Sequence, residues 1–97
     1  MTAYIINQLT VTDPSYQKEY YPGVAAVLDK YEGMQIVGSP PVECLEGVWQ
    51  LPERVAILEF PILQKSKTFW NDPVYEPFKK ARQSGAIGKV MLVDGVK

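Results

Sequence analysis

The sequence predicts an α+β sandwich, in which a four-stranded antiparallel sheet carries helices on one face. Four segments rich in β-branched and aliphatic residues are typical of strands, at 3–11, 34–39, 54–60 and 87–95. Helix-like segments lie between the first two strands and between the last two, so the order is β-α-β-β-α-β. This order favours a split β-α-β arrangement, with one layer of helices on one layer of sheet.

The first half of the chain carries its own start and stop signals. Residues 3–11 place apolar side chains on both faces, which predicts a strand covered on each side. Asp13 directly before Pro14 predicts the N-cap and first position of a helix. Pro22, which a glycine follows, predicts a kink or a break in that helix, and Gly33 predicts its left-handed C-terminal cap.

The second half predicts a helix in two parts. Pro40 is expected to stop the second strand, and residues 42–47 are a candidate edge ribbon of the sheet. Residues 63–70 predict a short helix, and Asp72 before Pro73 predicts the cap of the next. The apolar side of that next segment, which Gly85 ends, is expected to consist of Val74, Tyr75, Phe78 and Ala81.

One sheet face is left without helices, and its side chains are mostly apolar. Tyr4 and Ile6 on the first strand point there if Ile5 packs on the helices. Neither face of the third and fourth strands is polar enough to lie comfortably against water. An open apolar face of several hundred Å² is more often an interface than a solvent surface. We therefore predict a homodimer in which two sheets pack face to face.

Composition excludes several chemistries. The net charge of −1 gives no field that would attract nucleic acid or an anionic membrane. The absence of histidine removes Ser-His-Asp and Cys-His catalysis, His-ligated haem and the usual zinc sites, so no metal or cofactor is expected. The lone Cys44 forbids an intrachain disulfide and suits a reducing compartment. With no recognisable signal peptide or membrane span, the expected location is the cytoplasm.

Two charged residues on the third strand, Arg54 and Glu59, are candidate site residues. Five positions apart, they lie on opposite faces of a regular strand, so Arg82 is the better partner for Glu59. A structural ion pair or a dimer contact is one interpretation. The other is a ligand-anchoring role for all three charges, with Glu59 as the weak candidate for a catalytic base.

Three further residues are candidates for a ligand-binding cleft between sheet and helices. Asn7 lies among aliphatic neighbours and needs hydrogen-bond partners, although these can be purely structural. Trp70 and its neighbour Phe69 are adjacent on a short helix, so one faces the core and the other is free to line a cleft. Tyr75 carries a hydroxyl that needs a partner if it is buried.

Several runs of the chain resemble the DUF1330 family of small bacterial proteins. They are the opening "AYIINQLTVTDP" and the runs "LEGVWQLPERVAILEFP" and "FWNDPVYEPFKKAR". The marks are Asp13-Pro14, Tyr20, Gly33, Glu46-Gly47, Trp49, Pro52-Glu53-Arg54, Glu59-Phe60-Pro61, Tyr75 and Arg82. The resemblance covers residues 1–97 as a single domain and implies a ferredoxin-like protomer of the dimeric α/β-barrel superfamily, but no activity. The chain departs from the family pattern at Ile62 and at Asn7.

The same superfamily suggests one enzymatic comparison. Its cofactor-free and haem-degrading monooxygenases use an Asn on the first strand and a Trp on a later helix, and Asn7 and Trp70 occupy comparable places. The haem-degrading members also need an axial histidine, which this chain lacks. We therefore expect a small dimeric protein that binds a small molecule, with cofactor-independent catalysis left open. The alternative is a non-catalytic structural or interaction module.

Overall fold

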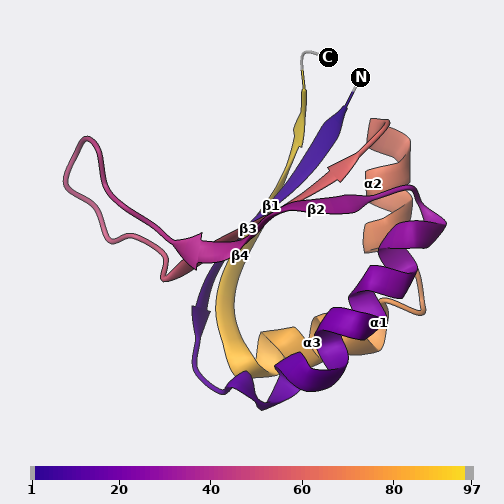
Figure 1. The fold of residues 1–97 in the computed structure, drawn as a ribbon, viewed down its shortest axis with the longest axis horizontal. Coiled ribbons are helices and arrows are strands. Elements are labelled where there is room, and N and C mark those ends of the chain that lie inside the picture. Colours follow the sequence, from indigo (N-terminus) through magenta and orange to yellow (C-terminus); the bar gives the residue numbers. More distant parts are fainter. Residues whose placement is uncertain (1, 96–97) are drawn as a thin grey trace.

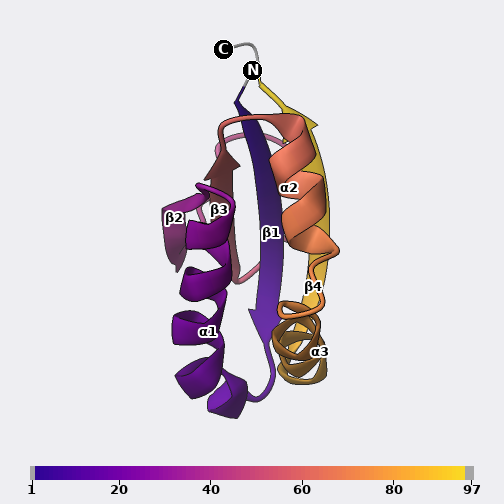
Figure 2. The ribbon, with the colours of Figure 1, turned by 90° about the vertical axis from the view of Figure 1, so that its right-hand side faces the viewer.

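The computed structural model describes residues 2–95, apart from the side chain of Ser39. The elements in chain order are β1 (Ala3–Val11), a 3-10 turn η1 (Pro14–Tyr16), α1 (Gln17–Lys30), β2 (Met34–Pro41), β3 (Arg54–Phe60), α2 (Leu63–Trp70), α3 (Glu76–Gly85) and β4 (Ala86–Asp94). The strands form one antiparallel sheet in the order β2-β3-β1-β4. The helices lie on one face of this sheet (Figure 2). The predicted α+β sandwich is confirmed.

The start of the first helical segment follows its sequence signals. The Asp13 carboxylate accepts the Ser15 backbone N–H at 3.0 Å, directly before Pro14. The first turn is a 3-10 turn, after which α1 runs without a break through Pro22. The glycine after Pro22 has a packing role, because a Cβ at Gly23 would lie 2.3 Å from the Phe78 ring of α3.

The predicted left-handed cap at Gly33 is wrong by one residue. Glu32 has the positive φ of 58°, and Gly33 donates its N–H to the Leu28 carbonyl at 2.9 Å, which completes the capping motif. Gly33 is required for another reason: a Cβ there would lie 2.7 Å from the Phe60 ring. Glycine at this position therefore allows close packing of the turn on the core.

The region between β2 and β3 departs most from the sequence prediction. β2 continues through Pro40 to Pro41, which is tolerated because β2 is the edge strand of the sheet and is irregular there. The predicted edge ribbon at 42–47 is wrong, since residues 42–53 contain no strand. This segment, which we call the arm, projects away from the body of the protein (Figure 1).

The predicted split of the second helical segment into α2 and α3 is confirmed. The predicted cap is wrong, because the N-cap of α3 is Tyr75 and Asp72 lies in the turn before it. The Asp72 carboxylate accepts the Val74 N–H at 2.7 Å and Lys30 Nζ at 3.0 Å, and it also accepts the Tyr31 hydroxyl. These bonds tie the end of α1 to the α2–α3 junction. The Val74 side chain is exposed, so its expected place on the apolar side is wrong.

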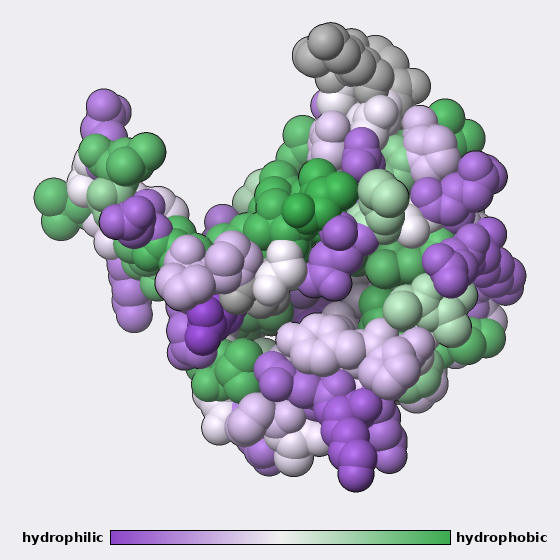
Figure 3. All heavy atoms as spheres, in the orientation of Figure 1, coloured by the Kyte–Doolittle hydropathy of each residue, from purple (hydrophilic) through white to green (hydrophobic). Residues whose placement is uncertain are grey.

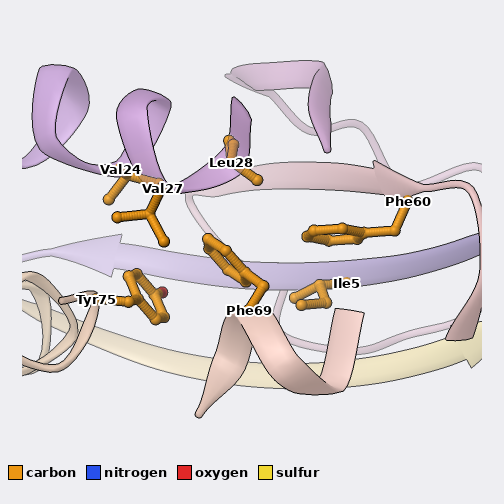
Figure 4. Packing of buried hydrophobic residues seen from close by; sticks show 7 residues of the cluster. All are labelled: Ile5, Val24, Val27, Leu28, Phe60, Phe69 and Tyr75. Atoms are coloured by element: carbon orange, nitrogen blue, oxygen red, sulfur yellow. The ribbon is translucent and has the colours of Figure 1, made fainter. Parts of the chain in front are cut away.

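The core lies between the sheet and the three helices (Figure 4). Its buried side chains come from β1, β3, α1, α2 and the α2–α3 turn: Ile5, Val24, Val27, Leu28, Phe60, Phe69 and Tyr75. Phe69 is the centre of this cluster, with its ring 4.5 Å from that of Tyr75 and 5.3 Å from that of Phe60. Burial of these rings is a major source of the protomer's stability.

No helix among residues 2–95 covers the opposite face of the sheet (Figure 2). Cross-strand pairs place on it the partly or fully exposed side chains of Tyr4, Ile6, Val37, Val55, Ile57, Met91 and Val93. We call this set the outer face. The predicted division of the strands into two apolar faces is therefore confirmed.

Candidate functional site

A cavity of about 240 Å³ lies between the inner face of the sheet and the helices. Figure 3 shows the molecule hollowed where the sheet curves away from α1 and α3. Strands β1, β3 and β4 form one wall and α1 forms another, while Trp70 and Tyr75 close the side towards α2 and α3. The lining is mainly aromatic and aliphatic, as in most small-molecule sites.

Asn7 is the polar group that β1 contributes to this cavity. Alternation along β1 directs Ile5, Asn7 and Leu9 to the helical side, where each is buried. The Asn7 Oδ1 atom is buried and has no hydrogen-bond partner within the part of the chain that the structure describes. An unpaired buried carbonyl oxygen costs free energy, so it is rare without a reason.

Trp70 and Tyr75 form the aromatic wall, and their rings lie 5.9 Å apart. Lys79 lies behind them, 8% exposed, with Nζ at 4.4 Å from the Trp70 ring centre. This cation has its partners, because Nζ donates to the Trp70 carbonyl at 2.9 Å and pairs with Glu76 at 3.2 Å. Lys79 therefore supports the wall and does not require a ligand.

Arg82, on the last turn of α3, is 2% exposed and lines a neighbouring recess of about 460 Å³. This recess shares Trp70 and Val90 with the cavity. The guanidinium carbon lies 6.0 Å from the Trp70 ring centre. Nε and Nη2 have no hydrogen-bond partner, and no carboxylate among residues 2–95 forms an ion pair with Arg82. A buried charge of this kind is expensive to leave unpaired.

Tyr20 of α1 lines the cavity and interacts electrostatically with Arg82. Burial raises the pKa of the Tyr20 phenol, and Tyr75 raises it further, while Arg82 lowers it. The net pKa shift is strongly upward, so Tyr20 is a neutral phenol and does not neutralise Arg82. In the sequence, Tyr20 is noted only as one of the marks of the family resemblance; its hydroxyl was the available signal.

The structure assembles four of the predicted residues in one region: Asn7, Trp70, Tyr75 and Arg82. Arg54 lies elsewhere, in a recess at the arm end of the sheet that Glu53 and Gln17 also line. Glu59 lies on the outer side of β3, because its neighbour Phe60 is buried against the helices.

The predicted ion pair between Glu59 and Arg82 is therefore wrong. The two side chains belong to opposite sides of the sheet, since Glu59 pairs across the strands with Tyr4 while Arg82 packs against the helical side. Glu59 is also absent from the lining of the cavity and of the Arg82 recess. A base in this cavity cannot be Glu59 of the same chain.

No three His, Cys, Asp or Glu side chains between residues 2 and 95 gather closely enough to hold a metal ion. Within the same residues, no helix has the length and apolar character to cross a membrane. The site chemistry available to these residues is therefore hydrogen bonding, aromatic contact and the positive charge of Arg82.

Solved structures with the same fold span almost the whole chain. RPA0582 from Rhodopseudomonas palustris, a protein of unknown function, has a TM-score of 0.76 at 18% identity and covers 99% of this chain and 83% of its own. SnoaB from Streptomyces nogalater, a cofactor-independent oxygenase, has a TM-score of 0.67 at 14% identity and covers 99% and 94%. At these identities the likeness shows the fold alone.

A third neighbour is described as a dimeric ferredoxin-like protein of unknown function, from Jannaschia sp. CCS1. It has a TM-score of 0.67 at 10% identity and covers 98% of this chain and all of its own. The fold is thus ferredoxin-like. A search of curated proteins found no match. The profile of the family described as "Domain of unknown function (DUF1330)" matches residues 2–96. The chain therefore belongs to the DUF1330 family, as its motifs suggested.

Proposed function

We propose that this protein is a homodimer that binds a small molecule in the cavity between sheet and helices of each protomer. The observation that carries the binding function is that buried polar atoms of Asn7 and Arg82 have no partner within the described part of the chain and lie beside a cavity with aromatic walls. Structural side chains are normally satisfied within the fold, whereas binding sites hold polar groups ready for a ligand.

The outer face supports the dimer. Met91 and Val93 on this face are 44% and 41% exposed, and Ile87 beyond them is 69% exposed. Ferredoxin-like neighbours of this fold include proteins described as dimeric. Packing two outer faces together would remove these side chains from water and give a two-fold interface. Near-zero net charge gives no support to nucleic acid or a membrane as a partner.

The arm adds apolar surface to the same assembly. Leu45 is 97% exposed and Trp49 is 55% exposed, and both belong to a segment that projects beyond the body of its own protomer (Figures 1 and 3). A second copy is a natural place for these side chains to be covered. The exposed thiol of Cys44 in this arm suits the reducing cytoplasm that we propose as the location.

A ligand screen by thermal shift tests the binding function. Small acids, neutral aromatics and nucleotides are added to the wild-type protein and to Val90→Phe, which fills the space shared by the cavity and the Arg82 recess. We expect one ligand class to raise the Tm of the wild type but not of Val90→Phe. The matched control is Val74→Phe at an exposed site, which should respond like the wild type.

Absence of stabilisation by every class would contradict small-molecule binding. It would favour the alternative in which the protein is a non-catalytic interaction module whose dimer is the functional unit. In that case the outer face and the arm would still control assembly, while the cavity variants would change only stability.

A second candidate function is cofactor-independent oxygenation. The observation in its favour is that Asn7 and Trp70 both line the cavity, as the comparison within the superfamily implied, and that SnoaB shares the fold. This function is tested by oxygen consumption with easily oxidised phenols. Turnover that Asn7→Ala abolishes would support it, and no consumption with any phenol would remove it from consideration.

A further inference from the structure

The two unpaired donors of Arg82 lie on the same edge of its guanidinium. Nε and Nη2 have no partner among the described residues, and they present their N–H bonds side by side. This edge matches the two oxygens of a carboxylate, which it can bind through two parallel hydrogen bonds. The side chain is 2% exposed, so bulk water does not replace such a partner freely.

The charges around Arg82 also require an anion. Lys79, the other buried cation among residues 2–95, is paired with Glu76, whereas Arg82 has no carboxylate partner there. The Tyr20 phenol near it is neutral because burial raises its pKa. The guanidinium therefore leaves one positive charge in the protein interior that a ligand can neutralise.

The second unpaired group, Asn7 Oδ1, can accept a hydrogen bond from a donor on the same ligand. Asn7 Oδ1 is buried without a partner and belongs to the cavity wall. It lies close to Arg82 along the sheet: Asn7 pairs with Val90, and Arg82 Nη1 would lie 3.4 Å from a Cβ on Gly88, two residues away on the same strand. A ligand with both an anionic and a hydroxyl group can satisfy both residues.

The size and walls of the site limit the body of the ligand. The cavity that Asn7 lines, about 240 Å³, is smaller than most drug-sized pockets, so the part of the ligand that enters it is better a single ring than a fused ring system. Trp70 borders both the cavity and the Arg82 recess, so a ring seated between them contacts its indole.

We propose that the site binds a compact hydroxylated aromatic acid, with its carboxylate on the Nε–Nη2 edge of Arg82, its ring beside Trp70 and its hydroxyl donating to Asn7 Oδ1. This inference rests on the proposed binding function and specifies its ligand class. It requires no covalent step.

The test uses benzoate and its three hydroxy isomers as probes, with benzamide and phenol as neutral counterparts, in thermal-shift and calorimetric titrations of the full chain. The hydroxy acids should bind more tightly than benzoate, and benzoate more tightly than benzamide. Arg82→Lys keeps the charge but loses the planar pair of donors, so it should bind the acids at least about tenfold more weakly. Asn7→Leu should remove the advantage of the hydroxy acids and leave benzoate binding.

Arg82→Met separates a ligand-binding role from a structural one. An unpaired buried guanidinium destabilises the empty protein, so this variant should keep or raise the ligand-free Tm while it loses the response to acids. The control Lys80→Met removes an exposed charge from the same helix and should bind as the wild type does.

Two results would overturn the inference. If neutral aromatics bind as well as the acids, or if Arg82→Met binds acids like the wild type, the carboxylate class is wrong while small-molecule binding in the cavity stands. If no probe of either kind binds, the inference fails. The broader thermal-shift screen then tests separately whether the cavity binds any small molecule.

Discussion

The two faces of one sheet differ in how completely the chain packs them. On the inner face, Ile5 and Phe60 are 4% and 0% exposed and lie under three helices (Figures 2 and 4). On the outer face, Met91 and Val93 remain about two-fifths exposed although they are equally apolar. Alternate residues of the same strands thus differ in how much of their side chains is exposed to solvent. Helices cover the inner face within one chain, while the exposure of the outer face supports the proposed dimer.

The inner face also contains buried polar atoms that have no hydrogen-bond partner among residues 2–95. These atoms are Oδ1 of Asn7 and Nε and Nη2 of Arg82. Elsewhere on this side polar groups are satisfied, as at Asp72 and Lys79. The contrast supports the proposal that the inner face serves binding as well as stability. The following variants test this comparison, from the largest expected effect to the smallest.

Phe60→Ala tests the inner face and should have the largest effect. Phe60 is fully buried and contacts Phe69 at a ring separation of 5.3 Å. Its truncation should lower the free energy of unfolding by about 3–5 kcal/mol, because it loses apolar burial and leaves a cavity. Chemical denaturation at several protein concentrations measures this loss, which should appear at each of them. A loss below about 1 kcal/mol would show that the inner core is not the main stabilising element.

Ile6→Lys tests the outer face. It places a charge among the apolar residues that we propose to be buried in the dimer, while the inner face keeps its packing. The dimer should lose about 2–3 kcal/mol, a roughly hundredfold increase in its dissociation constant. Analytical ultracentrifugation checks this at micromolar concentration. Ala26→Lys, at an exposed position of α1 on the helical side, is the control. A wild-type protein that sediments as a single chain would contradict the dimer itself.

Asp72→Asn tests a polar contact at the rim of the inner layer. Hydrogen bonds from Tyr31, Val74 N–H and Lys30 lower the pKa of Asp72 from 3.8 to about 2. A carboxyl with a lowered folded pKa stabilises the protein fully above pH 3.8, and this contribution is lost as the pH falls towards 2. The variant should therefore show a flatter fall in stability over this window.

Thermal unfolding between pH 2 and pH 5 provides the comparison for Asp72. Lys30→Met should change the profile less, because the Lys30 side chain is 61% exposed and its ion pair is screened by water. Equal slopes for the wild type and Asp72→Asn would mean that the carboxylate has no specific role.

Asp13→Ala should have the smallest effect of the series. Asp13 caps the first turn at the outer end of the helical layer, where its carboxylate accepts the Ser15 N–H at 3.0 Å. Loss of an N-cap costs about 1 kcal/mol. Denaturant unfolding should show this loss with the dimer unchanged in sedimentation. A concentration-dependent loss would place this cap at the interface and weaken the separation between the two faces.

Local signals in the sequence were sufficient for the order of the elements. Asp13 and Pro14 act within one turn, and alternation along β1 and β3 requires only the geometry of a strand. The same alternation separates Arg54 from Glu59 and identifies an outer face without helices. These features depend on residues close together in the chain, so they could be predicted without knowledge of the fold.

Tertiary structure alone decided which distant residues meet. Asn7, Trp70 and Arg82 gather because β1, α2 and α3 pack together, while Glu59 points away from Arg82 because β3 presents Phe60 to the core. No local pattern carries this information. The chain by itself determines which segments become strands and helices, since backbone and side-chain preferences act over a few residues. Packing determines the site, since it fixes the long-range contacts that those preferences leave open.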